Sequence, residues 1–195
     1  MTVGEVKARA SSGAVLLMGR GVALQALGFL GNLALARLLV PEDFGIVAIG
    51  LTIVNVGRML AGAGLGSALI GRTEPPARTE LAALMGLQLL ITGAVAAATG
   101  VVALTVGGDA PVTALMVLAL PLITLRAPAL LLFQRQLQFL AQLKVEIAET
   151  VVYLAVAITL AALGLGPWAL AIGLLVRALT GTTVALSLSP GARVA

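Results

Sequence analysis

The chain has 195 residues, of which 60% are hydrophobic and only 10% charged, with a formal net charge of +4. Soluble globular proteins average about 25% charged residues, so this composition excludes an ordinary water-soluble domain and indicates a chain that lies in a bilayer. Cysteine and histidine are both absent, and the twelve lysines and arginines are scattered singly, so we expect no enzyme, no metal, no cofactor and no nucleic-acid partner.

Six apolar segments follow one another along the chain, separated by short breaks that contain charges, proline or glycine. The predicted spans lie near 14–39, 44–70, 80–106, 112–133, 142–164 and 168–188. Each is long enough for the roughly 20 residues that a spanning helix needs, and the first is too long for the apolar core of a secretory signal. The sequence therefore predicts an all-α, polytopic membrane protein with six transmembrane helices in a single domain over residues 1–195.

The first break, "LARLLVPEDFGIVAIG" at residues 35–50, contains two adjacent acids. Pro41 suits the first turn of a helix, and Glu42 and Asp43 are favoured at the positive end of its dipole. Adjacent carboxylates on a helix point in different directions, and no base or metal ligand accompanies them. We interpret this stretch as a turn between spans and not as a catalytic pair.

The charges in the breaks predict the orientation of the chain. If the N-terminus is cytoplasmic, the outer side keeps only Arg37, and the inner side collects Lys7, Arg9, Arg72, Arg78, Arg135, Lys144 and Arg193. Positively charged loops face the cytoplasm, so we expect both termini there, with the chain as a multi-pass protein of the cytoplasmic membrane.

Four arginines fall inside the predicted spans: Arg20, Arg58, Arg126 and Arg177. A charge at mid-bilayer costs at least about 2.5 kcal/mol and usually faces a bundle interior or a cavity. Arg58 and Arg177 lie close to their helix midpoints. Arg20 lies nearer the cytoplasmic side, where its side chain could also reach lipid phosphate.

Small and polar residues recur beside these arginines at helical spacing. The stripes are Gly21, Gln25, Gly28 and Asn32; Asn55, Arg58, Gly62 and Gly66; and Gly173, Arg177 and Gly181. Glycines at this spacing are typical of close helix packing, but a tight dry seam has no room for a guanidinium. We therefore predict that Arg58 and Arg177 line a cavity, with an interhelical ion pair as the alternative.

Two acids and two prolines complete the set of candidates. Glu146 and Glu149 near the start of the fifth span are either solvated charges at a helix N-terminus, ion-pair partners of Arg126 or Arg177, or a titrating coupling site. Pro121 and Pro128 flank Arg126 and predict a kinked or broken fourth span.

Several motifs in order resemble a known family from about Arg20 to the end of the chain. They are "LARLLVPEDFGIVA", "AGAGLGSALIGR", "LLFQRQLQF" and "GLGPWAL". They resemble bacterial polysaccharide biosynthesis proteins, the O-antigen and exopolysaccharide flippases of the multidrug/oligosaccharidyl-lipid/polysaccharide exporter superfamily.

The resemblance implies alternating-access flipping of undecaprenyl-pyrophosphate-linked oligosaccharide across the bacterial cytoplasmic (inner) membrane, driven by ion gradients. It implies a cationic cavity for the headgroup, with Arg58, Arg126 and Arg177 as binding residues and Arg20 as a fourth candidate. Glu146 and Glu149 become candidates for ion coupling or counter-ions. Arginine suits this role, since its permanent charge captures phosphate oxygens in pairs.

Members of this family have two similar lobes, and six spans correspond to one lobe. We therefore expect a second lobe or a homodimer partner, beside lipid-linked oligosaccharide and membrane lipid. Two alternatives stay open: a multidrug-type exporter lobe, although the arginines would repel cationic drugs, and a non-transporting membrane assembly protein.

Overall fold

The computed structural model describes residues 3–62, 78–135 and 138–188, and within these ranges the chain is helical with no strand. The helices are α1 (Val3–Leu38), α2 (Pro41–Gly62), α4 (Arg78–Val106), α5 (Ala110–Val117), α6 (Ala119–Leu125), α7 (Ala127–Arg135), α8 (Phe139–Ala162) and α9 (Pro167–Leu188). The predicted all-α class is confirmed.

Five of the six predicted spans each correspond to one helix or to one run of helices, whereas the second, near 44–70, is described only as far as Gly62 and its remainder lies outside the described residues. Four described helical segments are long and apolar enough to cross a membrane: α2, residues 85–106 of α4, α8 and α9. The run from α5 to α7 makes a fifth if it is counted as one bent span, and the apolar part of α1 is the shorter stretch Leu24–Leu38. Several apolar helices thus make this a multi-pass membrane protein, for which six spans is an approximate count.

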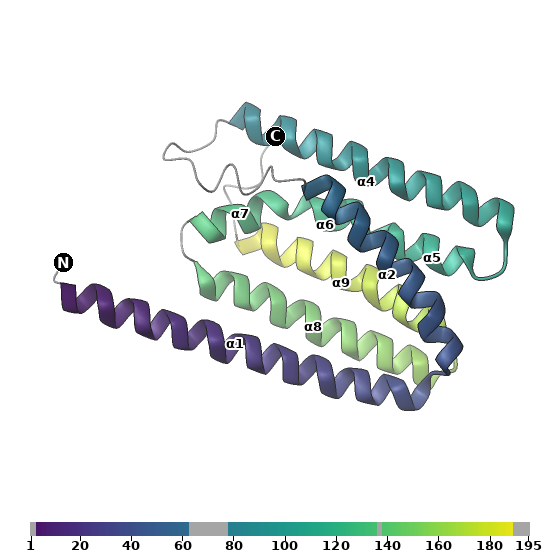
Figure 1. The fold of residues 1–195 in the computed structure, drawn as a ribbon, viewed down its shortest axis with the longest axis horizontal. Coiled ribbons are helices and arrows are strands. Elements are labelled where there is room, and N and C mark those ends of the chain that lie inside the picture. The colour runs from purple at the N-terminus through teal and green to yellow at the C-terminus, as the bar shows by residue number, and fades with distance from the viewer. Residues whose placement is uncertain (1–2, 63–77, 136–137, 189–195) are drawn as a thin grey trace.

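The helices form one elongated bundle (Figure 1). α8 packs along α9 on one side and along α1 on the other, and α2 packs on α5 and α4. The turns that follow α1, α4 and α8 lie at one end of the bundle, on the right of Figure 1, and the start of α1 and the end of α9 lie toward the left. α4 is apolar and largely exposed, as expected of a helix that faces lipid.

The turn between α1 and α2 forms as the sequence predicts. α2 begins at Pro41, and the Asp43 carboxylate accepts the backbone N–H of Val40 at 3.1 Å. The same carboxylate lies against Gly166 in the turn before α9, where φ is +55° and an added Cβ would lie 3.3 Å from Asp43 Oδ1. Asp43 therefore stabilises the turn between α1 and α2 and packs against the turn before α9.

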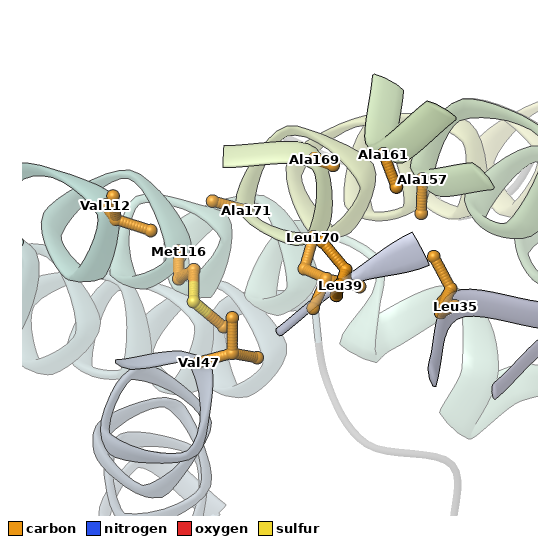
Figure 2. Close-up of a cluster of buried hydrophobic side chains, with 10 residues drawn as sticks. All are labelled: Leu35, Leu39, Val47, Val112, Met116, Ala157, Ala161, Ala169, Leu170 and Ala171. Atoms are coloured by element: carbon orange, nitrogen blue, oxygen red, sulfur yellow. The ribbon is translucent and has the colours of Figure 1, made fainter. Parts of the chain in front are cut away.

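A cluster of buried apolar side chains packs the bundle beside these turns (Figure 2). Its members are Leu35, Leu39, Val47, Val112, Met116, Ala157, Ala161, Ala169, Leu170 and Ala171. Four of the ten are alanines on α8 and α9, whose small side chains let these two helices approach closely. The bundle is consequently filled at this end, and open space is found farther along it.

Candidate functional site

A cavity of about 630 Å³ lies between α1, α2, α8 and α9, with residues of α5 and of the α6–α7 segment completing its wall. Val47, Met116 and Leu170 belong both to the apolar cluster and to the cavity wall, so the packed end of the bundle forms the cavity floor. The polar lining residues are Asn32, Arg58, Arg126, Gln142, Glu146, Glu149, Thr150, Tyr153 and Arg177.

Five of the six residues predicted for the site line this cavity. The cavity brings together Arg58 from α2, Arg126 from the break between α6 and α7, Arg177 from α9, and both Glu146 and Glu149 from α8. Position 20 lies on α1, but the side chain of the sixth candidate, Arg20, falls outside the part of the chain that the structure describes.

Glu149 is the centre of an ion-pair network. Its side chain is only 4% exposed, and its Oε1 accepts a hydrogen bond from Nη1 of Arg126. Its Oε2 lies 3.5 Å from Nε of Arg177. Of the three interpretations of this acid, the ion pair is the one observed: α8 begins at Phe139, so Glu149 lies well inside the helix and is not a solvated terminal charge.

Two glycines on α9 make room for this network. A Cβ at Gly181 would collide with Arg126 Nη1 and with the Glu149 carboxylate. A Cβ at Gly173 would lie 3.2 Å from Tyr153 Cδ2. The predicted stripe on α9 is therefore a packing seam at its glycines and a polar cavity wall at Arg177.

The predicted break in the fourth span is confirmed at Arg126. The helical axis bends by 46° between Ala110–Leu125 and Ala127–Phe133. Because Pro128 has no N–H to donate, the regular helical bonding cannot continue through this segment. Across the interface with α9, Thr182 Oγ1 donates to the carbonyl oxygen of Leu122 at 2.7 Å. The break thus fixes Arg126 where it can reach Glu149.

The three arginines have different surroundings. The Arg126 side chain is 13% exposed, whereas that of Arg177 is 43% exposed and its guanidinium carbon lies 5.7 Å from the centre of the Tyr153 ring. Arg58 is exposed on α2 and makes no ion pair with any residue that the structure describes. Arg58 and Arg177 each repel the charge of Arg126. Two of the arginines are therefore accessible, and one is enclosed.

Glu146 lies one helical turn before Thr150 on the same wall of the cavity. Its Oε1 accepts a hydrogen bond from Gln142 Nε2 at 3.3 Å, and its charge attracts Arg126. Three arginines against two glutamates leave the described lining with one positive charge in excess. The cavity is cationic, but its own acids offset much of that charge.

Sequence reasoning missed Tyr153, Gln142 and Thr150 as lining residues. All three lie on α8 at helical spacing from Glu146 and Glu149, so the face that carries the two acids already contained them. The helical spacing of the two acids therefore carried the signal for these three residues.

Comparison with known proteins adds one match. A family model described as polysaccharide biosynthesis protein matches residues 34–192, which include all three described arginines of the cavity and both glutamates. Neither the curated proteins nor the solved structures contain a significant match.

Proposed function

This chain belongs to the polysaccharide biosynthesis protein family, and we propose that it flips lipid-linked oligosaccharide, carried on undecaprenyl pyrophosphate, across the bacterial cytoplasmic membrane. In this proposal it is a transporter and not an enzyme. Both termini are cytoplasmic, and the headgroup enters the cavity from that side.

One observation supports the substrate class above the others: Arg58 and Arg177 are accessible in a cavity inside a bundle of membrane helices. Arginines held in a bilayer are costly, and a bound anion offsets that cost. The guanidinium group matches phosphate oxygens in a bidentate manner. A pyrophosphate headgroup has the charge and the geometry to bind both guanidinium groups, since Arg58 has no ion-pair partner among the described residues and Arg177 has only a long contact with Glu149.

In this proposal the role of each arginine depends on how far its side chain is buried. Arg58 and Arg177 contact the headgroup, while Arg126, enclosed and paired with Glu149, supports the wall. Arg20 stays a fourth candidate, because position 20 precedes the lining residue Leu24 by one helical turn.

A second lobe or a second copy of the chain completes the pathway in this proposal. Asn32 and Arg58 are exposed although they line the cavity, on α1 and α2 respectively. Polar side chains at membrane depth face protein or water and not lipid, so we propose that a partner covers this side.

The test is lipid flipping by the purified full chain in proteoliposomes. A fluorescent oligosaccharide on undecaprenyl pyrophosphate is supplied, and its access to a membrane-impermeant quencher is followed over time. We expect Arg58→Ala and Arg177→Ala each to reduce the rate at least about tenfold, since each removes a charged contact to phosphate. Arg37→Ala, at an exposed arginine outside the cavity, serves as the matched control and should retain the rate.

The same assay separates the alternatives. If the chain is a membrane assembly protein, it flips no lipid, even when it is reconstituted at high density so that copies can pair. Its folding and membrane insertion then tolerate both cavity substitutions. A multidrug-type exporter moves a cationic dye in place of the lipid. Either result contradicts the proposal.

A further inference from the structure

Glu149 is shared unequally between two arginines. Arg126 donates directly to Oε1, whereas Arg177 approaches Oε2 only through Nε at 3.5 Å. The two guanidinium groups compete for one buried carboxylate, and the closer one is also the more enclosed one.

The Arg126 side chain is confined in its contact with Glu149. It lies at the helix break, and the α9 backbone at Gly181 closes over its contact with Glu149 so tightly that even a Cβ would collide. Separating a buried ion pair leaves an uncompensated charge and is strongly unfavourable. The bond between Arg126 and Glu149 is therefore a fixed part of the wall.

Arg177 is held differently. Its side chain lines the cavity and is 43% exposed, and the Tyr153 ring supports its guanidinium independently of the carboxylate. An ion pair that is long and partly exposed contributes little, so it exchanges readily for a stronger acceptor. A phosphate group is such an acceptor.

We propose that Glu149 acts as an internal anion that pairs with Arg177 until a ligand binds. The phosphate of the ligand then replaces Glu149 as the partner of Arg177, while the ion pair with Arg126 keeps Glu149 in place. Glu149 is then a residue that determines how tightly the cavity holds an anion. This inference rests on the proposed function, because it requires an anionic ligand.

The experiment uses paired substitutions. Glu149→Gln alone would leave Arg126 as a buried charge without a partner, so it is combined with Arg126→Gln. The double variant loses one charge of each sign, and the net charge of the cavity is unchanged. Binding of radiolabelled farnesyl pyrophosphate to the full chain in nanodiscs is measured. We expect the double variant to bind about two- to fivefold more tightly, the effect of removing one partly exposed ion pair.

Two further variants test whether the gain in affinity depends on Arg177. Adding Arg177→Gln to the double variant should abolish the gain, since the gain acts through Arg177. If the glutamine pair does not fold, Arg126→Met with Glu149→Leu replaces the ion pair by apolar residues and carries the same expectation. Inorganic pyrophosphate and farnesol, tested alongside, show whether the phosphates or the lipid supply the affinity.

The outcomes separate this inference from the proposed function. A folded double variant that binds no more tightly than the original chain, when the original chain binds and Arg177→Gln weakens it, overturns the inference alone. An original chain that binds farnesyl pyrophosphate no better than farnesol overturns the proposed function, and the inference with it.

Discussion

At the scale of single residues, the same side chain has three different environments in one cavity. Arg58 is exposed and lacks an ion-pair partner among the described residues, Arg177 is half-exposed beside a tyrosine ring, and Arg126 is enclosed with Glu149. All three carry the same permanent charge, so burial and neighbours decide which of them can meet a ligand. The chemistry of the site thus depends more on the surroundings of the arginines than on their number.

Tyr153 provides a prediction at this scale. Its ring lies 5.7 Å from the Arg177 guanidinium carbon and supports it by a cation–π contact, which is worth about 0.5–1 kcal/mol at an accessible site. Tyr153→Leu removes the ring and should weaken the binding of farnesyl pyrophosphate about two- to fivefold. Tyr153→Phe keeps the ring and should bind like the original chain. Equal loss in both variants would assign the effect to the hydroxyl and contradict the contact.

At the scale of helices, local sequence signals and interhelical contacts have separate roles. Hydrophobic stretches and breaks set where each helix begins and ends, and Pro128 sets the bend beside Arg126. Glycines then decide how closely α9 approaches its neighbours. Gly173 admits the Tyr153 ring, and Gly181 admits the Arg126–Glu149 pair.

Gly181 gives the prediction for this interface. Gly181→Ala places a Cβ against the ion pair, and overpacking of a filled interior destabilises by about 1–3 kcal/mol. We expect a lower thermal unfolding midpoint of the purified protein in detergent. The matched control is Gly93→Ala on α4, where a Cβ meets nothing within 4 Å, and where alanine favours the helix. A Gly181→Ala variant as stable as the Gly93→Ala variant would contradict the tight contact.

At the scale of the whole molecule, the end of the bundle beside the turns is apolar and filled, whereas the cavity is charged and open. The apolar cluster fills the bundle beside the three turns, and the charged cavity lies beyond it. For the proposed function, this asymmetry suits a pathway open to one side of the membrane, since apolar packing would exclude a headgroup and its water at the other side.

Orientation is the prediction at this scale. The chain contains no cysteine, so single cysteines can be introduced without removing any. Glu42→Cys and Asp109→Cys lie at exposed positions in or beside the turns, and Gln138→Cys lies at an exposed position before α8. From the distribution of lysine and arginine, we expect a membrane-impermeant maleimide added outside whole cells to label positions 42 and 109 and not 138. The reverse pattern would place the termini outside.

The sequence by itself determined the spans, the turn at Pro41 and Asp43, and the break at Arg126, because hydropathy and proline act on the chain locally. It also marked Arg58, Arg126 and Arg177 as unusual, since a charge in a long apolar run is costly wherever the run packs.

Only the tertiary structure decided that Glu149 pairs with Arg126 and Arg177, that Tyr153 supports Arg177, and that Arg58 has no ion-pair partner in the described chain. These facts depend on which faces of α2, α8 and α9 meet, and residues far apart in the sequence share no local signal that reports it. Helical spacing gives the face on which a side chain lies, whereas its partner is set by how the helices pack against one another.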